Sequence, residues 1–154
     1  MLFELIDASK ALLTPLIALI ALFIAYQQFK MNKLKVKIDV FARRLELYEA
    51  TRSLLAQIVR EGKIDFENAL QYARDTSGAR FLVGKDVTEY LKEIHSRCID
   101  LASAQDQLYG IDSASTSDRP ALIQQKTDAL KWLVEQFEPL AKHFEPYISI
   151  SKLK

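Results

Sequence analysis

Residues 11–29 have the sequence ALLTPLIALIALFIAYQQF, in which no side chain carries a charge. At about 1.5 Å per helical residue this segment reaches about 28 Å, close to the roughly 30 Å hydrocarbon core of a bilayer. Pro15 lies in the first turn of such a helix, where a missing N–H group is tolerated. The segment therefore predicts one transmembrane helix over residues 11–29, which follows a short N-terminal segment over residues 1–10.

Two other interpretations of this segment are a cleaved signal peptide and a buried core helix. A signal peptide begins with basic residues, whereas this chain carries Glu4 and Asp7 there, and no clear small-residue cleavage site follows the apolar run. A buried core helix needs a domain that covers its apolar surface on every side, and the rest of this chain is too small for that. We therefore favour the transmembrane helix.

Four lysines follow the apolar segment before any acidic residue occurs: Lys30, Lys33, Lys35 and Lys37. Lys and Arg residues beside a membrane span are retained in the cytoplasm, so this pattern places residues 30–150 there and the short N-terminus outside. The same lysines are expected to bind the headgroups of anionic lipids. Because Cys98 is the only cysteine, the chain has no intrachain disulfide, which fits a reducing cytoplasm.

Small residues recur along one face of the predicted transmembrane helix, at Ala11, Thr14, Ala18, Ala21 and Ala25. Helices associate in lipid where small side chains let their backbones approach closely. The alternation of three-residue and four-residue steps is typical of a parallel, left-handed bundle. We therefore expect a homo-oligomer, although alanine is also common in transmembrane helices that do not associate.

The rest of the chain has the composition of an all-α protein. Gly and Pro number only four each among 154 residues. Neither occurs between Leu16 and Glu61, so the transmembrane helix is expected to continue to about Gly62 and to lead into a cytoplasmic antiparallel helical bundle over residues 30–150. Residues 151–154 form a tail. The apolar residues of this helix beyond the membrane have heptad spacing: Leu34, Ile38, Phe41, Leu45, Tyr48, Leu55 and Val59.

Three further helices are expected in the bundle, at about Asp65–Asp75, Asp86–Tyr109 and Pro120–His143. Asp86 and Glu89 have the spacing of a capping box at the start of the second of these. Pro139 is expected to kink the last helix, and Pro146 to end it. Residues 110–119 are rich in Ser, Asp and Thr and are expected to form a loop.

The chain lacks the motifs of catalysis. Its formal net charge of +1 gives no reason to expect a nucleic acid as partner. His95 and Cys98 lie three residues apart on one helical face, a spacing that suits a metal or a nucleophile with its base. Because no further ligand accompanies them, we interpret the pair as a packed thiol and a half-exposed imidazole. With no phosphate-binding loop, dinucleotide motif or serine elbow, we expect a non-enzyme without catalytic residues, metal or cofactor.

The segment FARRLELYEA at residues 41–50 is the most distinctive part of the bundle. It places Phe41, Arg44 and Tyr48 on one helical face. The Arg44 guanidinium is expected to lie against an aromatic ring while its stem packs on apolar surface. We interpret this set either as a structural clasp of the bundle or as a surface that binds a cytoplasmic protein partner.

Three other segments have a similar aromatic character: FLVGKD at residues 81–86, Tyr90-Leu91, and FEPYI at residues 144–148. Together with the apolar helix and the 41–50 segment, they resemble a widespread group of small bacterial single-pass membrane proteins with a helical cytoplasmic domain. The resemblance implies a bacterial inner membrane, and it transfers no catalytic residues.

Two functions fit these features. In the first, the chain is a membrane effector whose copies gather through the alanine face and perturb or open the membrane. This architecture is similar to that of small helical effectors in bacterial antiphage systems. In the second, the chain is a tether or adaptor whose bundle binds a protein partner. The alanine face favours the effector.

Overall fold

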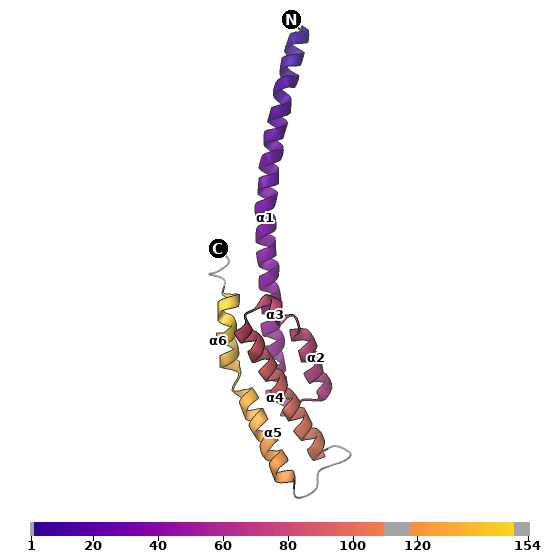
Figure 1. Cartoon of the computed structure of the whole chain (residues 1–154), viewed down its shortest axis with the longest axis vertical. Coiled ribbons are helices and arrows are strands. Elements are labelled where there is room, and N and C mark those ends of the chain that lie inside the picture. The colour runs from indigo at the N-terminus through magenta and orange to yellow at the C-terminus, as the bar shows by residue number, and fades with distance from the viewer. Residues whose placement is uncertain (1, 110–117, 150–154) are drawn as a thin grey trace. The chain divides into compact units, whose positions relative to one another are not determined.

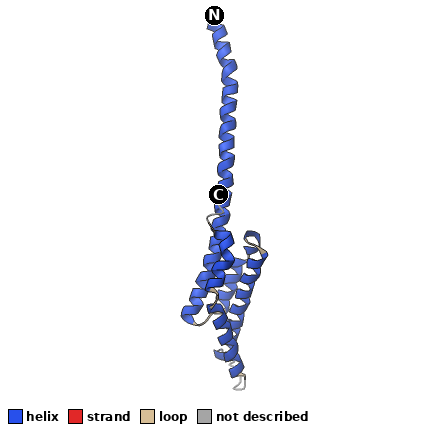
Figure 2. Ribbon diagram, turned by 90° about the vertical axis from the view of Figure 1, so that its left-hand side faces the viewer, coloured by secondary structure: helices blue, strands red, loops and turns tan. Residues whose placement is uncertain are grey.

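The computed structural model describes residues 2–109 and 118–149, and within these ranges it describes the side chains from residue 13 onward except that of residue 14. All the regular elements in these ranges are helices, as Figure 2 shows, which confirms the predicted all-α class. The chain divides into two compact units, Met1–Asp39 and Val40–Lys154. The predicted tail at residues 151–154 and most of the predicted loop at residues 110–119 lie outside the described residues.

Helix α1 covers Leu2–Glu61 and contributes residues to both units. It contains no glycine, and Pro15 is the proline inside it. Gly62 ends the helix, as predicted. Its φ of 63° is a left-handed conformation that glycine adopts without steric strain, and its N–H donates a hydrogen bond of 2.8 Å to the Ile58 carbonyl.

Two helices follow α1, namely α2 at Phe66–Thr76 and the short α3 at Ala79–Leu82. The start of α2 lies where the sequence predicts it. Asp65 is its N-cap, and the Asp65 carboxylate accepts a hydrogen bond of 2.7 Å from the Asn68 N–H. Helix α3 occupies the segment that connects α2 to the next helix.

Helix α4 covers Lys85–Tyr109 and begins one residue before Asp86, the first residue of the predicted capping box. The Gly84 carbonyl accepts hydrogen bonds of 3.0 Å from both the N–H and the hydroxyl of Thr88. Asp86 therefore lies inside the first turn, where it does not act as the N-cap. Glu89 pairs with Lys85 at 3.5 Å. The capping-box prediction is wrong because Thr88 and Gly84 form the first turn of this helix.

The predicted helix over Pro120–His143 consists of two helices, α5 at Arg119–Val134 and α6 at Phe137–Ile148. Pro139 lacks the N–H that would bond to the carbonyl of residue 135, and its ring crowds that carbonyl. The chain accordingly breaks at residues 135–136, and Pro139 lies in the first turn of α6, where the missing N–H is tolerated. Pro146 does not end the helix as predicted, since α6 continues for two residues beyond it.

Helix α4 is central in the Val40–Lys154 unit, where it packs against α2, α3, α5 and α6. Figure 1 shows α5 running back alongside α4 in the opposite direction, as expected for an antiparallel bundle. The apolar stripe of α4 is buried in the bundle and includes Val87, Leu91, Ile94, Cys98, Leu101 and Leu108.

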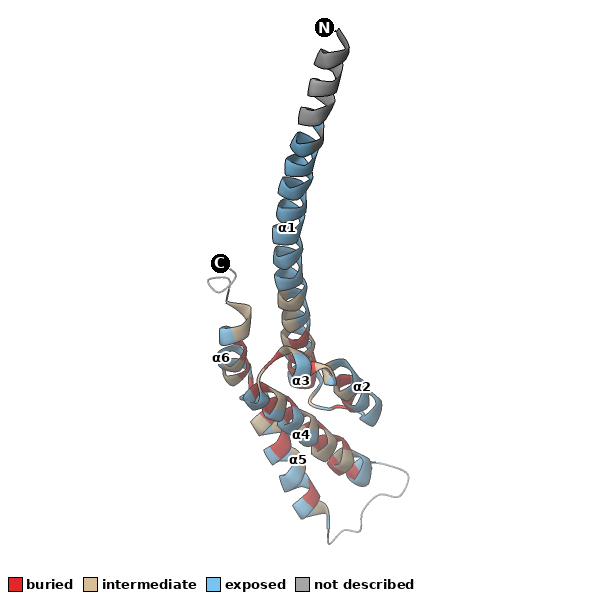
Figure 3. Cartoon of the chain, turned by 45° about the horizontal axis from the view of Figure 1, so that its top comes forward, coloured by how far each residue is buried: buried red, intermediate tan, exposed pale blue. Residues whose placement is uncertain are grey.

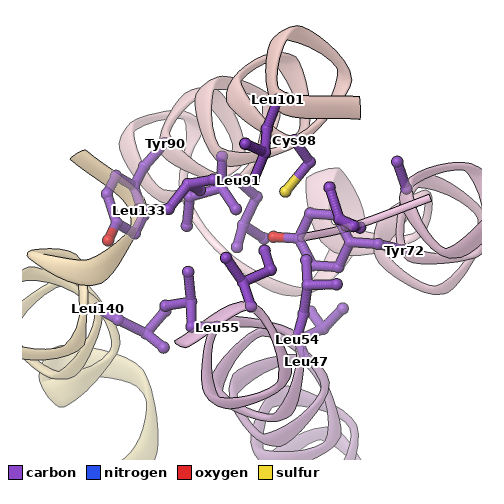
Figure 4. Packing of buried hydrophobic residues seen from close by; sticks show 14 of the residues in the cluster. Leu47, Leu54, Leu55, Tyr72, Tyr90, Leu91, Cys98, Leu101, Leu133 and Leu140 are labelled. Carbon is purple, nitrogen blue, oxygen red and sulfur yellow. The ribbon is translucent and has the colours of Figure 1, made fainter. Parts of the chain in front are cut away.

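The part of α1 in this unit buries one face against the other helices, as the colours of Figure 3 show. The buried residues of α1 are Leu47, Thr51, Leu54, Leu55 and Ile58. In Figure 4, Leu47 and Leu54 lie beside Tyr72 of α2, while Leu55 lies on the side nearer to Leu140 of α6; all belong to one core cluster with Leu91, Cys98 and Leu101 of α4. The predicted heptad set is right at Leu55, which is fully buried, and wrong at Val59, which is 48% exposed while its neighbour Ile58 is fully buried.

Candidate functional site

Three of the four segments that stand out in the sequence, at residues 41–50, 81–86 and 144–148, meet at one place in the Val40–Lys154 unit. Arg44 of α1 is the centre of this contact. Its Nε donates a hydrogen bond of 2.7 Å to the Leu82 carbonyl, at the end of α3. Its guanidinium carbon lies 5.4 Å from the centroid of the Tyr147 ring, on α6. We call Arg44, Leu82, Gly84 and Tyr147 the Arg44 clasp.

The sequence does not identify the aromatic ring that Arg44 contacts. The local pattern suggested Phe41 and Tyr48, which share its helical face, but the ring beside Arg44 belongs to Tyr147. Tyr48 instead packs edge-on against the buried ring of Phe144, with 5.7 Å between the centroids. Phe41 is half-buried. The structure therefore confirms an arginine against an aromatic ring and identifies that ring as Tyr147.

The Tyr147 hydroxyl connects α6 to the start of α4. It accepts a hydrogen bond of 3.0 Å from the Gly84 N–H and donates one of 3.4 Å to the Asp86 carboxylate. The approach requires glycine, because a Cβ at residue 84 would collide with the Tyr147 hydroxyl. The sequence singles out the segments that contain Gly84 and Tyr147, at residues 81–86 and 144–148. No spacing in the sequence indicates that these two residues contact each other.

The alternative interpretation of Phe41, Arg44 and Tyr48 is a partner-binding surface. A shallow pocket of about 370 Å³ adjoins Tyr48 and is lined on α6 by Ala141, Glu145 and Ile148. Arg44 itself is engaged by Leu82 and Tyr147. The contacts of Arg44 are thus those of a structural clasp, while Tyr48 retains an accessible edge.

The side chains predicted to act at the membrane lie in the Met1–Asp39 unit. Ala18, Ala21 and Ala25 are exposed, whereas the side chains of Ala11 and Thr14 lie outside the described residues. Across the described side chains, no helix combines the length and the apolar character that a membrane crossing needs. The predicted transmembrane helix over residues 11–29 includes residues 11, 12 and 14, which are not among those side chains.

The four lysines of the sequence prediction, Lys30, Lys33, Lys35 and Lys37, are all exposed. The Lys33 ammonium lies 4.5 Å from the centroid of the Phe29 ring, one helical turn earlier. This contact places a cation over an aromatic face. None of the four lysines forms an ion pair within the described ranges.

Cys98 and His95 occupy different environments on α4. Cys98 is fully buried, and burial raises the pKa of its thiol to about 12, which keeps the thiol protonated and unreactive at neutral pH. His95 is half-buried, as predicted. Among the residues of known placement, no group of three or more His, Cys, Asp or Glu side chains is arranged to hold a metal ion.

The core also contains a polar pair that the sequence did not predict. The Thr51 hydroxyl donates a hydrogen bond of 2.9 Å to the Leu47 carbonyl and lies 3.2 Å from the Tyr72 hydroxyl. Because the Thr51 proton points to Leu47, the Tyr72 hydroxyl is the donor to Thr51. The pair joins α1 to α2 inside the core.

The fold and the Arg44 clasp define an all-α protein with a helical bundle over Val40–Lys154. No protein-family model matches the chain, and no curated protein or solved structure is significantly similar to it. The resemblance to small bacterial membrane proteins therefore stays a prediction.

Proposed function

We propose that the chain is a membrane protein whose apolar segment at residues 11–29 spans a bacterial inner membrane. The observation that carries this proposal is the exposure of the segment. Every described side chain from Leu13 to Asp39 is exposed, including large apolar ones such as Leu19, Leu22 and Phe23. A helix that is apolar all round needs a cover of lipid or protein, because water is a poor solvent for such a surface.

The exposed lysines support an orientation for this proposal. Lys30, Lys33, Lys35 and Lys37 follow the apolar segment directly, and positive charge beside a span is retained in the cytoplasm. The helical bundle is then cytoplasmic and the short N-terminus is outside. A reporter fused after Lys154 is expected to be active only if it is of the cytoplasmic type, and activity of a periplasmic reporter there would contradict this orientation.

We further propose that copies of the chain associate through the alanine face and act as a membrane effector. Ala18, Ala21 and Ala25 lie on one side of α1, where nothing in the described chain covers them. A single span per chain lines a pore only after several copies assemble. A role in antiphage defence rests on the similarity of architecture alone.

A second candidate function is that of an adaptor, and an exposed aromatic residue favours it. Phe81 of α3 is 77% exposed, and the Arg80 guanidinium carbon lies 4.5 Å from the centroid of its ring. Aromatic and arginine side chains are enriched where proteins bind one another. In this function the membrane helix only anchors the bundle, and Phe81 contacts a cytoplasmic protein.

Replacing Ala18 and Ala21 with Leu separates the two functions. The segment stays apolar and still inserts, but the added bulk holds neighbouring helices apart. The effector proposal predicts that crosslinked oligomers and membrane depolarisation fall together while the amount of chain in the membrane is unchanged. The adaptor proposal predicts that depolarisation is absent from the start and that partner binding persists.

A matched control adds bulk to the opposite face of the same helix. Leu16→Phe with Ile20→Phe enlarges two side chains that lie away from the alanine face. This variant is expected to assemble like the natural chain. If the alanine variant and the control retain the same oligomer size and the same depolarisation, the alanine face does not mediate assembly and the effector proposal is wrong.

A further inference from the structure

A pocket of about 230 Å³ lies where α2, α3 and the first half of α4 come together. Its apolar lining includes Ala79 and Leu91, which are buried. Its polar lining is formed by Thr76, Ser77, Arg80, Thr88, Lys92 and His95. All of these residues belong to the Val40–Lys154 unit, and none belongs to the Arg44 clasp.

The pocket carries two positive charges. Arg80 and Lys92 line it, and no carboxylate side chain does. Within residues 2–109 and 118–149, neither cation forms an ion pair. Lys85, at the start of the same helix as Lys92, does pair with a carboxylate, that of Glu89. Both side chains are exposed, and the Arg80 guanidinium carbon lies 4.5 Å from the centroid of the Phe81 ring, so the two charges are open to a ligand that enters the pocket.

The hydrogen-bond donors of the pocket are available to the same ligand. The hydroxyls of Thr76 and Thr88 donate to backbone carbonyls, which leaves Ser77, Arg80 and Lys92 as the accessible side-chain donors. Nε2 of His95 is buried and has no hydrogen-bond partner in the described part of the chain. Native proteins rarely leave a buried polar atom without a partner, and either an ordered water molecule or a ligand that enters this part of the pocket would satisfy the nitrogen.

We propose that this pocket binds a phosphate group. A phosphate ester carries a charge of about −1.5 to −2 at neutral pH, which matches the two cations, and its several oxygens accept from the donors in the pocket. A carboxylate matches the pocket less well than a phosphate does, because it carries one negative charge and only two oxygens. The planar guanidinium of Arg80 suits paired hydrogen bonds to phosphate, and Lys92 adds a compact charge. This inference does not depend on the membrane proposal.

A phosphate group reaches such a pocket either on a small soluble molecule or on a lipid headgroup. Inorganic phosphate represents the first source. A short-chain phosphatidic acid, which carries a phosphate monoester, represents the second. The binding chemistry is the same for both, so the two probes identify the source.

The two histidines of the chain provide a direct readout of binding at this site. His95 lines the pocket, whereas His143 stacks on the Tyr90 ring with 4.2 Å between the centroids. Inorganic phosphate is titrated into the full chain in uncharged detergent micelles while the histidine ring signals are followed by nuclear magnetic resonance. The His95 signals are expected to shift until they saturate, and those of His143 are expected to stay in place.

Charge-removing variants test which residues hold the phosphate. Arg80→Gln and Lys92→Gln are each expected to weaken phosphate binding by roughly tenfold or more, since each removes a charge-assisted hydrogen bond. Lys85→Gln is the matched control, because it removes the same charge from α4 outside the pocket. It is expected to leave the affinity unchanged. Circular dichroism checks that all three variants keep their helices.

The two probes give outcomes that either support or overturn the proposal. Saturable binding of inorganic phosphate, weakened by Arg80→Gln and Lys92→Gln only, supports it with a soluble ligand. The same variant pattern with phosphatidic acid alone supports it with a lipid ligand. If neither probe shifts the His95 signals, or if Lys85→Gln weakens binding as much as Lys92→Gln does, the pocket is not a phosphate site.

Discussion

The Arg44 Nε donates a hydrogen bond of 2.7 Å to the carbonyl of Leu82 and thereby joins α1 to the end of α3. The same guanidinium lies over the Tyr147 ring, so one side chain contacts segments from the first, the middle and the last part of the bundle. This arrangement gives Arg44 a role in holding the bundle together that its neighbour Arg43 lacks. Among the described residues, Arg43 pairs only with the exposed Glu46, on the same helix.

Replacing Arg44 with Lys keeps the charge and removes the planar donor. The free energy of unfolding is expected to fall by about 1–2 kcal/mol, because a partly buried hydrogen bond to Leu82 and the stacking on Tyr147 are both lost. Urea denaturation of the full chain in detergent, followed by the fluorescence of the single tryptophan, Trp132, measures this change. Arg43→Lys is the control and is expected to change the stability by less than about 0.5 kcal/mol.

Gly84 and Tyr147 are expected to be coupled. The Cβ of Gly84→Ala collides with the Tyr147 hydroxyl and would lie 2.5 Å from the Asp86 carboxylate, so this variant should be destabilised by about 1–3 kcal/mol. In a Tyr147→Phe background the same change should be less harmful, because the hydroxyl is absent. A double-mutant cycle measures the coupling. Gly78→Ala is the control, since nothing lies within 4 Å of its Cβ; equal penalties for both glycines would refute the contact.

The buried Thr51–Tyr72 pair predicts an asymmetry between two substitutions. Thr51→Val leaves the buried Tyr72 hydroxyl without an acceptor and is expected to destabilise the fold by about 1–3 kcal/mol. Tyr72→Phe removes the Tyr72 hydroxyl itself, and the Thr51 hydroxyl still donates to the Leu47 carbonyl. Tyr72→Phe should therefore destabilise the fold less than Thr51→Val does. The double variant should be more stable than Thr51→Val alone. Equal losses from both single variants would show that Tyr72 finds another acceptor.

The free energy of unfolding is expected to decrease at alkaline pH, because the buried Tyr90 hydroxyl and Cys98 thiol lose their protons more readily in the unfolded chain. Burial raises the pKa of Tyr90 from its ordinary 10.0 to about 12 and that of Cys98 from 9.0 to about 12. The unfolded chain thus releases these protons at a lower pH than the folded chain does. The free energy of unfolding should be at its full value below about pH 9 and fall as the pH rises toward about 12.

Urea denaturation between neutral pH and pH 11 measures this decline. Tyr90→Phe removes one of the groups that titrate, so its stability should depend less steeply on alkaline pH than that of the natural chain. Cys98 should react with a thiol reagent only after denaturant is added. Fast labelling of the native chain, or a stability that does not change with pH, would contradict the burial of these groups.

Local signals in the sequence were sufficient for most helix boundaries of the bundle. Gly62 ends α1 because its backbone adopts a left-handed conformation, which glycine tolerates. Asp65 starts α2 because its carboxylate caps the first turn. The buried stripe of α4 follows the 3.6-residue period of its apolar residues. Each of these features depends on residues within one or two turns of one another.

Contacts between distant segments were not predictable in this way. The buried face of α1 includes the polar Thr51, whose hydroxyl contacts Tyr72 on another helix. The spacing of apolar residues alone therefore does not identify the whole buried face. Arg44 is locally closest to Phe41 and Tyr48, but the ring of Tyr147 reaches it through the packing of α6. The break before Pro139 depends on a backbone clash that is equally compatible with a kink.

The attachment of the full chain to a bilayer is the central claim, and flotation with inner-membrane vesicles in a density gradient at high salt tests it most directly. At about 1 M salt the electrostatic range falls to about 3 Å, so lysine contacts with lipid headgroups no longer hold the chain on their own. The chain is expected to float with the vesicles, whereas the double variant Ile20→Asp, Phe23→Asp should stay at the bottom, because charges inside a span oppose insertion. A natural chain that stays at the bottom at high salt would contradict the membrane-spanning segment at residues 11–29.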